Sequence, residues 1–75
     1  MRGLPRISGR EAVAALAKLG YEFDSPRGSH IGLRNPAPPF RRMVVPDHKE
    51  VATGTLRAII REAGLTVAEF IALLG

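Results

Sequence analysis

Apolar residues near the start of the chain recur with the period of an α-helix. Three of them fall on one helical face, namely Val13, Leu16 and Ala17. Ser8 and Glu11 have the spacing of a capping box, in which each side chain bonds the backbone of the other residue, and Gly20 is suited to end a helix. The pattern therefore predicts a helix over residues 9–19.

Short stretches that follow alternate apolar and polar residues, which is typical of strands. We expect strands at residues 21–24, 29–34 and 41–45. Residues 25–28, Ser-Pro-Arg-Gly, have the composition of a turn. Residues 35–39 contain three prolines, which remove backbone donors, so we expect a loop there.

The last third of the chain carries two further helical patterns. The first is expected to start near Thr53 and to stop at Gly64, and its apolar face consists of Leu56, Ile59, Ile60 and Ala63. Thr66 and Glu69 form a second capping box. It predicts a short C-terminal helix with an apolar face made of Val67, Phe70, Ile71 and Leu74.

This order of elements predicts the fold class. Each helix has one apolar stripe and the sheet has one apolar face, so the simplest packing places the helices on one face of a three-stranded antiparallel sheet. The class is α+β, in the order α-β-β-β-α followed by a short C-terminal helix. A chain of 75 residues is expected to form one domain, here residues 1–75 with residues 1–7 as an extended lead-in.

Composition excludes several classes of protein. The chain has no cysteine, which removes disulfides, thiolate zinc sites and cysteine nucleophiles and is compatible with a reducing cytoplasm. No apolar run approaches the roughly 18 residues of a membrane span, so we expect no membrane partner. Two histidines without cysteine do not supply the ligands of a zinc site. The glycine and lysine spacing of a phosphate-binding loop is missing too, so we expect neither a metal nor a cofactor.

The net charge of +4 is concentrated in one segment. Residues 27–49 hold a single anion, Asp47, together with five cations, Arg27, Arg34, Arg41, Arg42 and Lys49. In the rest of the chain the positive and negative charges cancel. A basic segment in a neutral frame predicts a polyanionic partner, because phosphates are bound by local clusters of cations. The alternative, from charge alone, is a solvated basic surface without a partner.

One histidine in this segment has a position that indicates chemistry. Ile31 and Leu33 are expected to face the helices. Because strand side chains alternate, His30 and Arg34 then face the opposite, open side of the sheet. Gly32 lies between them and leaves room for a ligand. An imidazole can take or give a proton near neutral pH; the alternative is a surface histidine with no role.

Three blocks of sequence together resemble the HicA family. They are Arg27-Gly28-Ser29-His30, Val45-Pro46-Asp47-His48 and the stretch from Gly54 to Leu65. The resemblance extends from about Ile7 to the C-terminus. It implies the α-β-β-β-α fold of double-stranded-RNA-binding domains and the toxin of a bacterial type II toxin–antitoxin system. It also implies that His30 is catalytic, and that a HicB-like antitoxin covers its face in a heteromeric complex.

The sequence departs from the family pattern at one position. Many HicA proteins have a second histidine where Ile31 stands. Because Ile31 is expected to face the core, its presence need not cost activity. His48 matches the family's histidine after Val-Pro-x, and its role is open between ordering the loop and contacting RNA.

These observations predict a cytoplasmic, metal-independent endoribonuclease, an mRNA interferase, in which His30 removes or relays the proton of an RNA 2′-hydroxyl. The residues expected to bind mRNA all belong to the basic segment: Arg27, Gly28, Ser29, Arg34, Arg41, Arg42, His48 and Lys49. Two alternatives are kept. One is a non-catalytic RNA-binding module that uses the same face, and the other is a domain that binds only protein.

Overall fold

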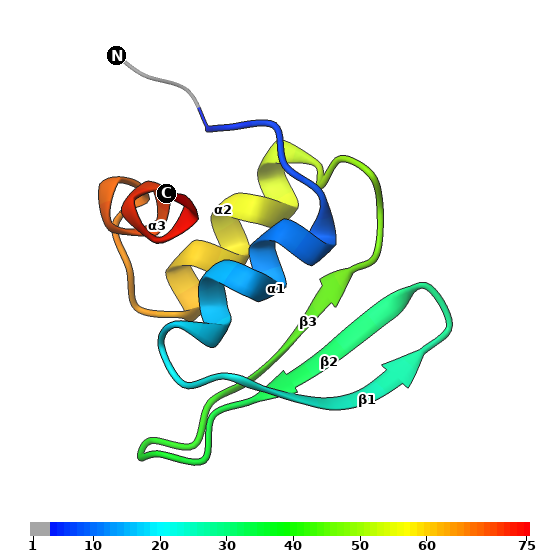
Figure 1. Ribbon diagram of the computed structural model, residues 1–75, viewed down its shortest axis with the longest axis vertical. Helices are drawn as coiled ribbons and strands as arrows, with labels where there is room; N and C mark the ends of the chain where they lie inside the picture. The colour runs from blue at the N-terminus through cyan, green and yellow to red at the C-terminus, as the bar shows by residue number, and fades with distance from the viewer. Residues whose placement is uncertain (1–3) are drawn as a thin grey trace.

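The computed structural model describes residues 4–75, except for the side chains of residues 25–27. Its elements follow the order α1 (Gly9–Ala17), β1 (Glu22–Arg27), β2 (His30–Arg34), β3 (Arg42–Pro46), α2 (Thr53–Glu62) and α3 (Val67–Leu74). The predicted α+β fold, α-β-β-β-α with a C-terminal helix, is confirmed. In Figure 1, α1 and α2 lie on one face of the sheet, and α3 packs against these two helices.

The sheet is antiparallel, with the strand order β1-β2-β3. His30 pairs with Pro46 at one end of the ladder between β2 and β3, and Arg34 pairs with Arg42 at the other end. β3 begins one residue later than expected and includes Pro46. The ladder therefore fixes which residues of the basic segment lie at the same end of the sheet as His30.

The core lies between the sheet and the helices. Its largest fully buried side chains are Phe70, Leu16, Leu56 and Val45. Full burial of an apolar side chain of this size contributes about 1.5–3 kcal/mol, so α3 stabilises the domain through Phe70. Both α1 and α2 pack on β3, whereas β1 curves outward from the helices, as Figure 1 shows.

The turn between β1 and β2 is shorter than the sequence predicts. We expected it at residues 25–28, but β1 continues to the turn itself, which consists of Gly28 and Ser29. Gly28 has a φ of 63°, which glycine adopts without steric cost. Pro26 is accepted within β1 because this is an edge strand, where a missing N–H can face outward. The predicted turn position was therefore wrong, and β2 begins at His30.

A β-bulge interrupts β1 at Asp24. Phe23 pairs with Leu33, whereas Ser25 pairs with Gly32, so that Asp24 is an extra residue in the strand. A bulge bends the strand that carries it and increases its twist. This accounts for the course of β1 away from the helices.

Local capping signals set the helix ends much as predicted. The Ser8 side chain accepts from the N–H of Glu11 and the Glu11 side chain accepts from the N–H of Ser8, and Thr66 and Glu69 make the same exchange at α3. α1 ends two residues earlier than expected, because residues 18–20 form a turn that closes on a glycine with a φ of 97°. Both predicted capping boxes are therefore confirmed.

The start of α1 is pressed against the end of β3. The N–H of Gly9 donates to the carbonyl of His48 at 2.9 Å. A Cβ at position 9 would lie 1.9 Å from the carbonyl oxygen of Pro46, so a side chain does not fit without a backbone shift. The N–H of Asp47 donates to the carbonyl of Ser29 at 2.7 Å. This α1–β3 junction, defined by Gly9, Pro46 and Asp47, therefore holds the turn that precedes β2.

An ion pair links the two sides of the α1–β3 junction. Arg10 donates from Nε and Nη2 to the two carboxylate oxygens of Asp47, at 3.2 and 3.3 Å. The hydrogen bond from Arg10 lowers the pKa of Asp47, and the same contact raises the pKa of Arg10. The pair is open to solvent, so its effect on stability is modest and sensitive to salt.

Gly9→Ala is expected to destabilise the domain by about 1–3 kcal/mol, because the added Cβ forces the backbones of α1 and β3 apart. The matched control is Gly54→Ala, where a Cβ would meet nothing within 4 Å. Alanine at that helical position is expected to be neutral or to stabilise by up to about 1 kcal/mol. Urea unfolding measures both free energies, and equal stabilities of the two variants would contradict the close contact at Gly9.

The Arg10–Asp47 pair is expected to make part of the stability depend on pH. The folded pKa of Asp47 is lowered, whereas an unfolded aspartate titrates near about 3.9. The stabilisation is therefore fully present well above pH 4 and is lost as the pH falls through the folded pKa. The difference in urea midpoint between wild type and Asp47→Asn should be largest at neutral pH. This difference should vanish in strong acid. A difference independent of pH would show that the charge of Asp47 contributes nothing.

Candidate active site and basic face

The side of the sheet that faces away from the helices, here called the open face, carries the predicted site. His30 and Arg34 are exposed on β2, and Arg42 and Val44 are exposed on β3. Gly32 pairs with Val44 between them. A hollow of about 240 Å³ lies here, lined in part by Gly32, Val44 and Arg42. The open face therefore has cationic side chains around a depression.

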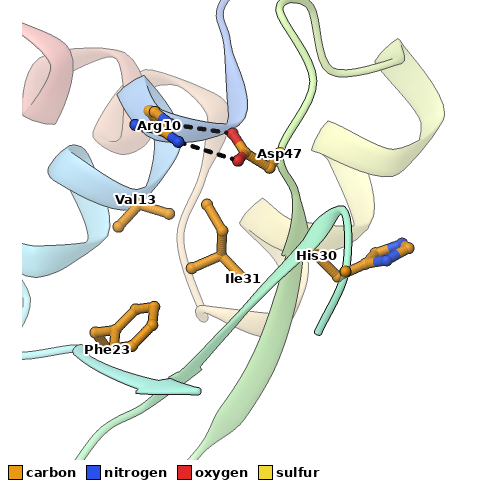
Figure 2. Close-up of a pocket in the computed structure, with 7 residues that line it drawn as sticks. Arg10, Val13, Phe23, His30, Ile31 and Asp47 are labelled. Carbon is orange, nitrogen blue, oxygen red and sulfur yellow. Dashed lines mark hydrogen bonds and ion pairs between the residues drawn. The ribbon is translucent and has the colours of Figure 1, made fainter. Parts of the chain in front are cut away.

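The two-residue turn determines where His30 lies. His30 is the first residue of β2, directly after Gly28 and Ser29, and its backbone pairs with Pro46 at the end of β3. Ile31 alternates to the helix side and packs against the core. In Figure 2 the His30 ring points away from the other labelled side chains. The imidazole is therefore accessible, as the sequence analysis expects.

Carboxylates of β1 lie beside the arginines of the open face. Arg34 Nη2 is 4.0 Å from Glu22 Oε1, and Arg42 Nη1 is 3.5 Å from Asp24 Oδ2. All four side chains contact solvent, and exposed pairs of this kind contribute at most about 1 kcal/mol each. A guanidinium group has five N–H donors. The two arginines are therefore loosely held and retain donors for an anion.

One of the arginines expected to bind RNA, Arg41, does not lie beside His30. Arg41 turns toward the helices, where its Nη1 donates to the carbonyl of Glu62 at the end of α2 and its guanidinium lies over Gly64. It therefore satisfies a helix terminus at the end of the sheet opposite His30. The side chain of Arg27 lies outside the described residues, and only its backbone pairing with His30 is described.

His48 and Lys49 lie in the loop that follows β3, and both are exposed. This loop begins directly after Pro46, the partner of His30, so it lies at the His30 end of the sheet. The carbonyl of His48 accepts from Gly9 at the α1–β3 junction. The backbone of His48 therefore orders the loop, and its side chain is left accessible.

A groove of about 340 Å³ lies on the helix side of the sheet, between α1 and β1. Its lining includes three apolar side chains and the ion pair of the junction, all drawn in Figure 2: Val13, Phe23, Ile31, Arg10 and Asp47. Phe23 is 61% exposed, because β1 curves away and α1 does not cover it. Gly28 and His30 also line the groove, although the His30 ring points away from the other labelled side chains in Figure 2.

Two searches for other kinds of site give negative results within the described residues. No three histidine, cysteine or carboxylate side chains among residues 4–75 gather where they could hold a metal ion. Over the same range, no helix has the length and apolar character that crossing a membrane requires.

Sequence reasoning missed the carboxylates that accompany the arginines. It did not connect Glu22 and Asp24 of the first expected strand to Arg34 and Arg42. The pairing requires the register of β1, which depends on the two-residue turn and on the bulge at Asp24. The one available signal was the alternation of Glu22, Phe23 and Asp24.

Comparison with known proteins assigns the family. A search of the curated proteins gives no match. The family model of the HicA toxin of bacterial toxin–antitoxin systems matches residues 9–65. This range is more than half of the chain and runs from α1 through the α1–β3 junction to the residue after the turn that ends α2. The chain therefore belongs to the HicA toxin family.

Proposed function

We propose that this HicA toxin is an endoribonuclease that cleaves single-stranded mRNA with His30 as its catalytic residue and without a metal ion. The observation that carries the proposal is the position of His30. It is an accessible imidazole at the end of β2, on the same open face as the guanidinium groups of Arg34 and Arg42. Membership of a toxin family supports an activity that harms the cell.

RNA contains the nucleophile for its own cleavage. In the proposed step, His30 accepts the proton of a 2′-hydroxyl, and the 2′-oxygen attacks the adjacent phosphorus. The bond from phosphorus to the 5′-oxygen breaks, and the leaving oxygen takes a proton from His48 or from water. The products are a 2′,3′-cyclic phosphate and a 5′-hydroxyl. No atom or electron has to come from a cofactor.

The arginines of the open face fit other phosphates of the same RNA strand. Arg34 and Arg42 pair across the strands and can approach a phosphate from the same side of the sheet as His30. Charge-assisted hydrogen bonds from guanidinium to phosphate are strong and often bidentate. Gly28, Ser29, His48 and Lys49 lie at the same end of the sheet as His30, and we assign them to the proposed RNA contact.

An antitoxin partner follows from the family, and we propose that it is HicB-like and covers the open face in a heteromeric complex. Arg34 and Arg42 already have carboxylate neighbours within this chain. Carboxylates of a partner could therefore occupy the positions that RNA phosphates would take. The proposed substrate, mRNA, places the activity in the cytoplasm.

His30→Ala is expected to slow RNA cleavage by at least 10²–10⁴-fold, the usual contribution of general acid–base catalysis. Its free energy of unfolding should stay within about 0.5 kcal/mol of wild type, because His30 is exposed. The assay uses end-labelled single-stranded RNA in EDTA and identifies the termini of the products.

The outcomes of this assay separate the alternatives. Cleavage by His30→Ala at the wild-type rate, or magnesium-dependent cleavage that leaves 5′-phosphates, contradicts the proposed mechanism. Wild-type protein that binds RNA without cutting it is instead an RNA-binding module. Wild-type protein that neither binds nor cuts RNA at low salt is a protein-interaction domain.

Removing the β1 carboxylates is expected to tighten RNA binding. Glu22→Gln and Asp24→Asn release Arg34 and Arg42 from ion pairs, each of which is worth up to about 1 kcal/mol, so each change should raise the affinity about two- to fivefold. The measurement is fluorescence anisotropy with labelled RNA in a His30→Ala background. Glu62→Gln, which makes the same change in net charge at the far end of α2, is the control. An equal gain from Glu62→Gln would mean that only net charge matters.

A further inference from the structure

We propose that Phe40, in the loop between β2 and β3, stacks on a base of the bound RNA and anchors the strand away from the reacting phosphate. This inference rests on the proposed function and adds a contact to it. It assigns Phe40 to substrate binding rather than to chemistry, because the loop lies at the end of the sheet opposite His30.

Phe40 is exposed in a way that the fold does not require. Its side chain is 64% accessible, and with Phe23 it is one of two phenylalanines that expose more than half of their surface among the described residues. Its φ is 60°, in the left-handed region that bulky residues rarely adopt. Unfavourable conformations of this kind concentrate at functional sites. A small residue would suit the position better if nothing had to contact the ring.

The loop holds Phe40 in a defined position. The N–H of Asn35 donates to the carbonyl of Arg41 at 2.8 Å, and the N–H of Phe40 donates to the carbonyl of Ala37 at 2.8 Å. The side chain of Asn35 accepts from the N–H of Ala37 at 3.0 Å and donates to the carbonyl of Leu19 at 3.2 Å. Prolines fix much of the remaining backbone. Ordering of this loop on binding therefore costs little, which favours affinity.

The charges beside Phe40 favour RNA over an apolar protein surface. Arg42 lies two residues after Phe40 on the open face, and Arg34 faces it across the ladder. The backbone of Phe40 therefore lies close in the chain to the arginine pair that we propose to contact phosphates. Alternating cations and aromatic rings are the usual means of holding a single strand, since every base has a face that can stack.

The spacing along the sheet suits one continuous strand. From His30 to Arg34 there are four residue steps, which span about 13 Å in a β-strand. A stacked nucleic-acid strand advances about 3.4 Å per nucleotide. An RNA with its scissile phosphate at His30 would cross the hollow at Gly32 and reach the two arginines roughly four stacked nucleotides away, or fewer if extended, and Phe40 lies beyond them.

The test measures RNA affinity in a His30→Ala background, so that the RNA stays intact. Phe40→Ala is expected to weaken binding of a fluorescein-labelled single-stranded RNA by about 5- to 100-fold, the usual effect of removing one stacking ring. Phe40→Trp should stay within about threefold of the parent, and Phe40→Leu should behave like alanine. The slope of affinity against salt should not change, because no charge is removed.

Two further variants keep the test sharp. Phe23→Ala removes an equally exposed ring from the helix side of the sheet and should leave RNA affinity unchanged. Phe40→Gly removes the ring in a residue type that accepts a φ of 60°, so it should fold even if Phe40→Ala does not. A 2-aminopurine base placed in turn along the RNA should show quenching at one position that disappears in Phe40→Gly.

The results distinguish this inference from the function on which it rests. RNA binding that is weakened by Arg34→Gln but not by Phe40→Ala or Phe40→Gly overturns the role of Phe40 and leaves the proposed function intact. Loss of antitoxin binding in Phe40→Gly with unchanged RNA affinity also overturns it, because Phe40 then contacts protein. If the parent protein binds no RNA at low salt, the proposed function fails, and this inference fails with it.

Discussion

The contact between Gly9 and the carbonyl of Pro46 is the constraint on which the His30 site depends. With no room for a side chain at position 9, the backbone of α1 can lie directly against the end of β3. The same approach lets Gly9 donate to His48, and it leaves Asp47 free to donate to Ser29, one residue before His30. Backbone contacts of this kind are stiffer than side-chain contacts. They position the His30 end of β2 in a domain too small to surround it with a core.

The bulge at Asp24 has opposite consequences on the two sides of the sheet. On the open face it brings the Asp24 carboxylate to Arg42, beside the pair that Glu22 makes with Arg34. On the helix side it carries β1 away from α1, so Phe23 is left at the rim of an apolar groove. One inserted residue therefore both moderates the charge of the open face and leaves the helix side of β1 uncovered.

The sequence was sufficient wherever a structural signal is local. The capping boxes at Ser8 and Thr66, the alternation in β2 and the outward position of His30 all depend on neighbours within four residues, and the structure agrees with each. The turn before His30 was placed wrongly because Pro26 suggests a turn, whereas the edge position that accepts it is a property of the whole sheet.

The rest of the site depends on contacts between residues far apart in the chain. Arg41 was grouped with the RNA-binding residues because of its charge, but the end of α2, 21 residues later, determines where it points. The ion pair of Arg10 with Asp47 joins residues 37 positions apart. Neither contact has a signature in a single sequence, and a charge count treats a cation that caps a helix and a cation that faces solvent alike.

The ion pairs of the open face bear on which anions it selects. Each pair is exposed and worth at most about 1 kcal/mol, so the phosphates of an RNA strand can displace both carboxylates. A single small anion gains one such contact, whereas a strand gains several contacts together with the release of its counterions. Displacing the β1 carboxylates therefore costs a large share of the binding energy of an isolated phosphate. It costs only a small share of the binding energy of a polymer. A protein partner that brings several carboxylates to the same face gains by the same argument, so one arrangement of weak pairs suits both the proposed RNA substrate and the proposed antitoxin contact.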